Sequence, residues 1–184
     1  MPASPFLPGV AMQAVHCSLE RHGQAVLDIF NDAIANSTAL YDYRPRTAQN
    51  IDDWFAAKER GGFPVLGFEG EEGDLLAFGS YGHFRAFPAY KYTVEHSIYV
   101  QRDHRGQGLG EALMRELIAA ARAADMHVMI GGIDMGNAAS IALHEKLGFV
   151  HAGTIRQAGF KFGRWLDLGF YQLTLDTPRD PVDG

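Results

Sequence analysis

The amino-acid sequence predicts an α/β fold in which one mixed, mostly antiparallel sheet is covered by helices. Short apolar runs of strand character alternate with longer runs of helical period. In the second half, one strand, helix, strand unit has the order of a crossover connection. The length of 184 residues, 47% of them hydrophobic, suits one domain with a sizeable core. The predicted order of elements is βααβββαβαββ.

The first half of the chain predicts a strand, two helices and a β-hairpin. Ser18 and Thr47 are candidate N-caps that precede apolar residues at helical spacing, and Gly61-Gly62 ends the second helical pattern. A polar segment rich in glycine and acidic residues joins two apolar runs, as in a hairpin. The expected elements are a strand over residues 12–19, helices from Ser18 and from Thr47, and strands over residues 64–69 and 75–81.

The second half predicts the crossover unit and a final pair of strands. Apolar and polar residues alternate from Tyr92 to Val100, and an apolar stripe follows from Gly108 to Ala124. Gly148 stands where a helix C-cap is expected. The expected elements are a loop over residues 82–89, a strand over 92–100, a helix over 108–124, a strand over 127–133, a helix over 137–147, strands over 149–155 and 166–175, and a loop over 159–164.

Composition and charge restrict the expected cellular location and the expected binding partners. The formal net charge of −6 argues against a general nucleic-acid or membrane-surface binder, and no apolar run is long enough to span a membrane. The one cysteine, Cys17, allows no internal disulfide, so a reducing, cytoplasmic setting is expected. The eight histidines show no metal-ligand spacing, so no metal is expected. Residues 1–10 predict a loose N-terminal arm, residues 11–176 the domain, and residues 177–184 a frayed tail.

A glycine-rich turn between a strand and a helix predicts an anion site. In the run from Arg105 to Gly110, bare backbone N–H groups can approach a phosphate, and the helix that follows directs its N-terminus to the same place. A P-loop would need Gly-Lys-Ser/Thr where Gly110-Glu111-Ala112 stands, and a dinucleotide fingerprint would need glycine at Glu111. Both of these nucleotide sites are therefore excluded. A glycine-rich turn without any ligand is the structural alternative.

Two motifs resemble the GCN5-related N-acetyltransferases (GNAT). These are Arg105-x-x-Gly108-x-Gly110 and the run from Asn137 to Phe149. The resemblance implies a GNAT fold with a splayed central strand pair and acetyl-CoA as co-substrate, with no metal. His144 stands where many members carry a tyrosine that protonates the departing thiolate, so the resemblance implies a general acid there. The cofactor-binding residues that it implies are Ile98, Tyr99, Val100, Arg105, Gly106, Gln107, Gly108, Leu109, Gly110, Glu111, Asn137 and Lys146.

Glu95 is the candidate general base. A carboxylate in the middle of an apolar strand is costly unless it is paired or solvated, and partial burial would raise its pKa toward a useful range. The structural alternative is an ion pair with Arg85. For His144 the alternative is a structural hydrogen bond on a helix face, and for Lys146 and Arg85 it is a solvated side chain.

A narrower resemblance concerns the phosphinothricin and methionine sulfoximine N-acetyltransferases. It rests on the runs Thr93 to Ser97, Tyr81 to Arg85 and Gly159 to Asp167. It implies acetylation of the α-amine of a small amino acid or analogue, with Glu95 as base, and a homodimer. It places Phe84, Arg85, Glu95 and His96 at the substrate, where the Arg85 guanidinium suits a carboxylate. Lys161, Arg164 and Trp165 would line either the pocket or a dimer interface.

Other functions stay open at this stage. One is acetylation of a peptide N-terminus, a lysine or a polyamine, although Arg85 argues against a polyamine pocket. Another is a non-catalytic acyl-CoA sensor of the same fold, which a missing base would favour and the presence of Glu95 disfavours.

Overall fold

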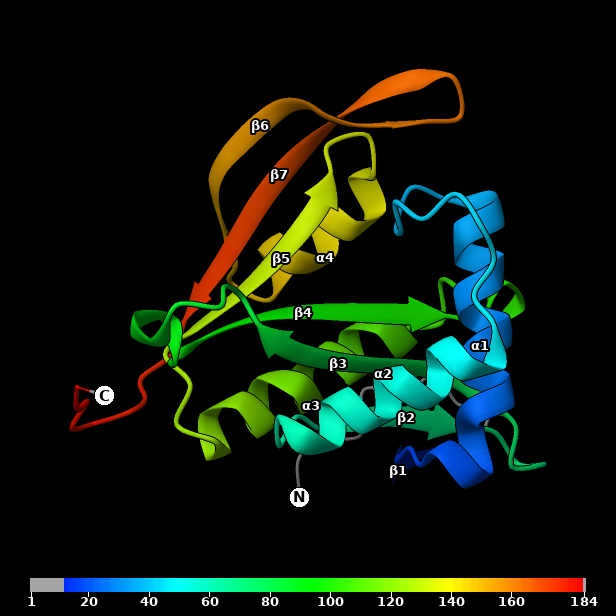
Figure 1. Ribbon diagram of the computed structural model, residues 1–184, viewed down its shortest axis with the longest axis horizontal. Helices are drawn as coiled ribbons and strands as arrows, with labels where there is room; N and C mark the ends of the chain where they lie inside the picture. The colour runs from blue at the N-terminus through cyan, green and yellow to red at the C-terminus, as the bar shows by residue number, and fades with distance from the viewer. Residues whose placement is uncertain (1–11, 184) are drawn as a thin grey trace.

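The computed structural model describes residues 12–183, which form a seven-stranded sheet in the order β1-β2-β3-β4-β5-β7-β6 (Figure 1). The predicted order of elements is confirmed. The predicted arm at residues 1–10 lies outside the described residues. The elements are β1 (Gln13–His16), α1 (Leu19–Asn36), α2 (Ala48–Arg60), β2 (Val65–Glu69), β3 (Leu75–His83), β4 (Thr93–Val100), α3 (Leu109–Ala123), β5 (Val128–Asp134), α4 (Ala138–Lys146), β6 (Val150–Lys161) and β7 (Arg164–Thr174), with short 3-10 turns at Pro88–Tyr90 and Arg102–His104.

The sheet is antiparallel except at its centre. β4 and β5 run parallel, but they pair only over Thr93–Glu95 and Val128–Ile130. Beyond that point the two strands separate, while β4 stays paired with β3 through Val100 (Figure 1). The splayed central pair that the GNAT resemblance implied is therefore confirmed. It opens the sheet between the two central strands.

Helices cover both faces of the sheet and bury two cores. The stripe of α3 packs Leu113, Met114 and Leu117 against one face. On the other face, α1 and α2 pack around Phe30, whose ring contacts Phe78 at a centroid distance of 4.9 Å. Both predicted helix caps are confirmed: Ser18 accepts from the N–H of Arg21, and Thr47 forms a capping box with Asn50.

The last hairpin differs from its prediction. Residues 159–164 were expected to be a loop, but β6 continues through Lys161 and β7 begins at Arg164. Phe162 and Gly163, with φ of 50° and 72°, turn the chain in two residues. Glycines at this end suggested a loop, whereas pairing across the hairpin holds the chain extended. Likewise, the loop expected at residues 82–89 begins only after His83, the end of β3.

Residues 175–183 form no helix or strand. Thr177 donates a hydrogen bond to Met126, and the N–H of Val182 donates to the Tyr92 hydroxyl at 3.2 Å. The predicted boundaries of the domain and tail stay predictions. Among residues 12–183, every helix is too short or too polar to cross a membrane.

Candidate active site

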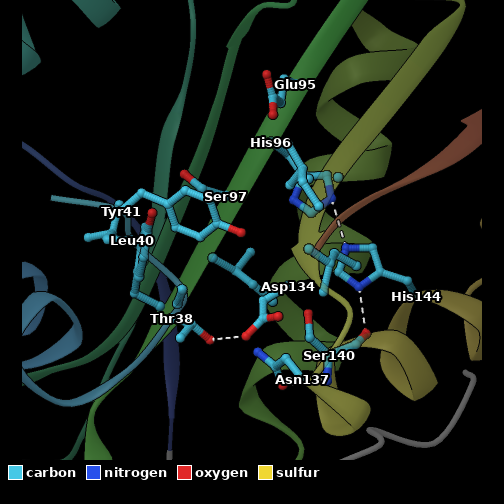
Figure 2. Close-up of a pocket in the computed structure, with 17 residues that line it drawn as sticks. Thr38, Leu40, Tyr41, Glu95, His96, Ser97, Asp134, Asn137, Ser140 and His144 are labelled. Atoms are coloured by element: carbon cyan, nitrogen blue, oxygen red, sulfur yellow. Dashed lines mark hydrogen bonds between the residues drawn. The ribbon is translucent and has the colours of Figure 1, made fainter. Parts of the chain in front are cut away.

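A cleft of about 240 Å³ opens where β4 and β5 separate (Figure 2). Its walls come from five parts of the chain. These are residues 95–99 of β4, residues 131–134 of β5, residues 38–41 between α1 and α2, Asn137, Ser140 and His144 around α4, and Leu168 of β7. The splay thus brings together three of the residues predicted from sequence to be functional, Glu95, His144 and Asn137.

Glu95 is a partly buried carboxylate at the last position of β4 that pairs with β5. Burial raises its pKa, and the positive charge of Arg85 opposes this shift. The alternative of an ion pair is not supported, because no nitrogen of Arg85 lies within 4.0 Å of a Glu95 oxygen. Oε1 of Glu95 lies over Gly132, where an added Cβ would be only 3.0 Å away. The strand beside it therefore leaves the carboxylate room on the cleft side.

His96 and His144 form a buried pair on the other face of β4. Their Nε2 atoms lie 3.1 Å apart, and Nδ1 of His144 lies 2.7 Å from the carbonyl oxygen of Ser140. That carbonyl can only accept, so Nδ1 of His144 carries the proton, and in a neutral ring Nε2 then accepts from His96. Burial lowers the pKa of His144 and lowers that of His96 to about 3, so both rings are neutral.

These two hydrogen bonds leave His144 without a proton that it could donate to a substrate. Neither of its ring nitrogens carries a free N–H, because Nδ1–H is bonded to Ser140 and Nε2 faces His96. Its predicted role as general acid requires that Nε2 first leaves His96 and takes up a proton. His96 Nδ1 is buried and has no hydrogen-bond partner among the described residues. His96, predicted at the substrate, lies at the cleft but points to the α4 side.

The predicted phosphate loop keeps its backbone free. The N–H groups of residues 106–111 have no hydrogen-bond acceptor among residues 12–183. Gly106 and Gly108 have φ of 76° and 85°, and a Cβ on either would meet open space. Six adjacent donors at the N-terminus of α3 make an anion cradle. Leu109 is buried in the core, so it contributes through its backbone only.

The charged side chains around this loop already have partners. Arg105 donates to Val100 O and lies 3.4 Å from Asp32, which also binds Arg102 at 2.6 Å. Lys146 binds Glu111 at 2.6 Å. That bond, with a second from Arg115, lowers the pKa of Glu111.

Four other residues predicted to bind the cofactor differ in which of their groups stay available to a ligand. The Gln107 amide donates to the Asp103 carbonyl, and Gly110 packs in ordinary contact with Leu143. Oδ1 of Asn137 caps α4 by accepting from Ser140 N, whereas its Nδ2 has no hydrogen-bond partner within residues 12–183. Tyr99 has its side chain in the core under α1 and α2, so what it offers is backbone.

Ile98, Tyr99 and Val100 lie beyond the last β4 residue that pairs with β5. Among residues 12–183 nothing pairs with their backbone edge toward β5, so this edge is available to bind a ligand as an added strand would.

The predicted substrate pair lies beside the cleft and not in its wall. Phe84 contacts Phe170 at a centroid distance of 6.4 Å, and Phe170 packs near the Gly132 position that adjoins Glu95. The Arg85 guanidinium lies 5.1 Å from the centroid of the Phe84 ring. Arg85 is thus close enough to act on the Glu95 pKa while its donors stay available.

Sequence reasoning missed the wall formed by the segment between α1 and α2. Its polar members are Thr38 and Tyr41, and Thr38 Oγ1 donates to the buried carboxylate of Asp134 at 2.6 Å. The only signal was a break in helical pattern at residues 36–43, which does not tell a connection from a binding wall. Asp134, at the end of β5, also accepts from Gly136 N.

Within residues 12–183, no group of three or more His, Cys, Asp or Glu side chains could hold a metal ion. In this cleft the Glu95 carboxylate can accept a proton, and outside its wall the free N–H groups of residues 106–111 can bind an anion.

Comparison with known proteins agrees with this geometry. The model of the acetyltransferase (GNAT) family matches residues 25–149. A relative from Pseudomonas paraeruginosa, named L-methionine sulfoximine/L-methionine sulfone acetyltransferase, is 49% identical over 84% of this chain and 90% of its own. A solved structure from Acinetobacter baylyi is 56% identical with a TM-score of 0.95, over 97% of this chain and 100% of its own. A phosphinothricin acetyltransferase from Sinorhizobium meliloti, solved with acetyl-CoA, has a TM-score of 0.86 at 31% identity, covering 89% of this chain and 88% of its own.

Proposed function

The chain belongs to the GNAT acetyltransferase family, and we propose that it moves an acetyl group from acetyl-CoA to the α-amine of a small amino acid or analogue. Methionine sulfoximine, methionine sulfone and phosphinothricin are the candidate analogues. The proposal is supported by the names of relatives that span most of the chain. The observation that carries it is the Glu95 carboxylate, partly buried and without an ion pair at the cleft where the central strands separate.

The residues present fit acetyl-CoA. The free N–H groups of residues 106–111 would hold its pyrophosphate, and the unpaired edge of Ile98 to Val100 would bind its pantetheine arm. The free Nδ2 of Asn137 would donate to the same arm. When bound, acetyl-CoA supplies an acetyl group as a thioester.

Glu95 is proposed as the general base. An α-ammonium group has a pKa near ~8 and must lose a proton before its nitrogen can attack a carbonyl. A carboxylate whose pKa is raised by burial is a better proton acceptor than a solvated glutamate. His144 is proposed as the acid for the departing thiolate. Because its Nε2 carries no proton in the neutral ring, this atom would first leave His96 and take up a proton from solvent, which it would then give to the thiolate.

Charge in the cleft favours a neutral substrate side chain. Two carboxylates, Glu95 and Asp134, line the cleft, and Asp134 has an ion pair with Arg164 at 3.5 Å. No Lys or Arg among the described residues lines the cleft, and the two histidines are neutral. A phosphinate side chain would meet the like charge of Glu95, whereas a sulfone or sulfoximine would not. We therefore propose that methionine sulfone or sulfoximine is the better substrate and phosphinothricin the poorer one.

Thiol release with a panel of amines tests the function. The protein is incubated with acetyl-CoA and with methionine sulfone, methionine sulfoximine, phosphinothricin, a peptide and a polyamine in turn. Faster release with the neutral amino-acid analogues than with the other amines would support the proposal. Release only with the peptide or polyamine would overturn it, and acetyl-CoA binding without release from any amine would indicate a sensor.

Arg85 is expected to bind the α-carboxylate. Its guanidinium lies near Glu95 without an ion pair, so its planar donors are available for a bidentate contact. We expect Arg85→Ala to weaken binding of the amino acid by about 1.5–3 kcal/mol, the range for hydrogen bonds to charged groups. This loss should appear as a higher KM for the amino acid. The KM for acetyl-CoA should stay unchanged. Steady-state kinetics against both substrates check this, and equal effects on the two KM values would exclude a carboxylate clamp.

A homodimer built on the β6–β7 hairpin is also proposed. β6 is an edge strand of the sheet, and the paired Phe160 and Trp165 are exposed together with Ile155 and Phe162. We expect the wild type to have twice the chain mass by light scattering and Trp165→Glu to be monomeric. A monomeric wild type at high concentration would contradict this interface.

A cytoplasmic setting stays a prediction. It is supported by Cys17, a partly buried thiol whose pKa is raised to about 12 by burial and which therefore resists oxidation. Cell fractionation checks it, and recovery outside the cytoplasm would contradict it.

A further inference from the structure

Lys161 is a buried lysine at the end of β6, outside the lining of the cleft. The residue is only 4% exposed to solvent. Nζ donates to the carbonyl oxygens of Ile34, Ser37 and Leu40, at 2.7, 2.9 and 2.6 Å. Every N–H of the ammonium group is thus bonded, and all its acceptors lie at the end of α1 or in the segment that follows.

The end of α1 needs such a cation. The last turn of this helix carries no basic residue, although its carbonyls and macrodipole favour positive charge. Lys161 supplies that charge from the tip of the β6–β7 hairpin, which projects from the sheet on the side of this helix end (Figure 1). Burial lowers the pKa of Lys161, and the nearby carboxylate of Asp42 opposes the shift.

Two further contacts join the hairpin tip to the same segment. The Tyr43 hydroxyl donates to the carbonyl oxygen of Phe160 at 2.6 Å. The Tyr41 ring packs on Gly159 so closely that an added Cβ would lie 2.6 Å from a ring carbon. We call these contacts, with the three bonds of Lys161, the hairpin clasp.

The tip of the β6–β7 hairpin has a strained backbone. Phe162 has a φ of 50°, a left-handed conformation that costs a side chain of this size about 1–2 kcal/mol. In this conformation its ring lies 4.9 Å from Nζ of Lys161. Strained residues persist where their surroundings determine them, which is consistent with a tip shaped for the clasp.

The segment that the clasp holds is a wall of the cleft. Residues 38–41 line it opposite the histidine pair, and Thr38 is tied to Asp134 on β5 (Figure 2). Lys161 does not line the cleft, but it bonds Ser37 and Leu40 on either side of Thr38 and Ala39. The position of this wall therefore depends on a lysine that no substrate would touch.

We propose that Lys161 is a positioning residue that sets the affinity for the amino-acid substrate by fixing the wall of residues 38–41. The inference rests on the proposed function, because it assumes that an amino acid occupies this cleft. It predicts that loss of the clasp weakens binding of the amino acid while the acetyl-CoA side, formed by β4 and the loop of residues 106–111, keeps its affinity.

Lys161→Met removes the three donors and keeps the length of the side chain, and Lys91→Met is a matched control on a lysine outside the clasp. In Lys161→Met we expect a rise of about tenfold in KM for the amino acid, with kcat and KM for acetyl-CoA changed much less. We also expect faster amide hydrogen exchange in residues 37–43 and unchanged exchange in α3.

The exchange readout separates this inference from the proposed function. If the wild type acetylates no amino acid, faster exchange confined to residues 37–43 still supports the clasp. Unchanged exchange there, or equal changes in both KM values, overturns it. If Lys161→Met does not fold, Tyr43→Phe removes one bond of the clasp from an exposed side chain, and the same two readouts, with smaller changes, decide the matter.

Discussion

Glu95→Gln is expected to lower kcat by about 10²- to 10⁴-fold, the contribution of a positioned general base. The amide cannot take the proton of the substrate ammonium group, whereas its size and place on β4 are unchanged. Acetyl-CoA binding should stay at the wild-type level, because the free N–H groups of residues 106–111 lie elsewhere. Glu72→Gln, at an exposed glutamate in the turn between β2 and β3, is the matched control.

The pH dependence gives the same variant a second readout. In the wild type the rate should rise with pH through a pKa above the usual glutamate value of about 4.3, because Glu95 acts only when ionised. That limb should vanish in Glu95→Gln. A variant that keeps the wild-type rate between about pH 6 and pH 9, around the pKa of an α-amine, would exclude Glu95 as the base.

Glu95→Gln is expected to raise the stability of the fold at neutral pH while it lowers activity. The pKa of Glu95 is raised in the folded protein, so the folded state binds more protons than the unfolded state between the two pKa values. Stability is therefore lost as pH rises through that window, and at neutral pH the ionised carboxylate is a cost. We expect a higher Tm for Glu95→Gln than for the wild type at neutral pH, and a smaller difference in acid.

Gly131→Ala is expected to damage both fold and activity. An added Cβ would lie 2.7 Å from Nε2 of His144 and 2.9 Å from Nε2 of His96, between the two atoms that bond each other. Both rings are buried, and the bonds of His144 to Ser140 and to His96 hold the pair in place. Overpacking of this kind costs about 1–3 kcal/mol, and separation of the pair would add the loss of a buried hydrogen bond. Thermal unfolding and kcat measure the two effects.

Two neighbouring glycines provide controls for that experiment. At Gly136 an added Cβ would meet only ordinary contacts of 3.5 Å or more, so Gly136→Ala should leave Tm nearly unchanged. At Gly132 the added Cβ would lie 3.0 Å from Glu95 Oε1, so Gly132→Ala should act on the base and not on the histidines. A wild-type Tm and kcat in Gly131→Ala would contradict the expected displacement of the histidine pair.

The adjacent glycines of β5 separate the two sets of chemical groups in the cleft. Successive residues of a strand face opposite sides, so Gly131 leaves room for the histidine pair and Gly132 leaves room for the base. The sequence shows both glycines, but their meaning depends on which residues of β4 and α4 face them. Local patterns do not contain that information.

Much of the fold was determined by the sequence alone. Period, caps and turn residues predicted the order of elements, because helices and strands are set largely by local spacing of apolar residues. The loop from Arg105 to Gly110 and the strand that carries Glu95 were also found from sequence, since each is a contiguous motif. The family comparisons confirm the resemblance that these motifs carried.

Only the tertiary structure decided how distant residues meet. It showed that His144 bonds His96, that Arg105 turns toward Asp32, and that Phe84 and Arg85 stand beside the cleft and not in its wall. It also placed Lys161 under the end of α1, across more than half of the chain. Such contacts depend on the pairing of β6 with β7 and on the splay of β4 from β5. Strand register is a property of the whole sheet, so no local stretch of sequence encodes these contacts.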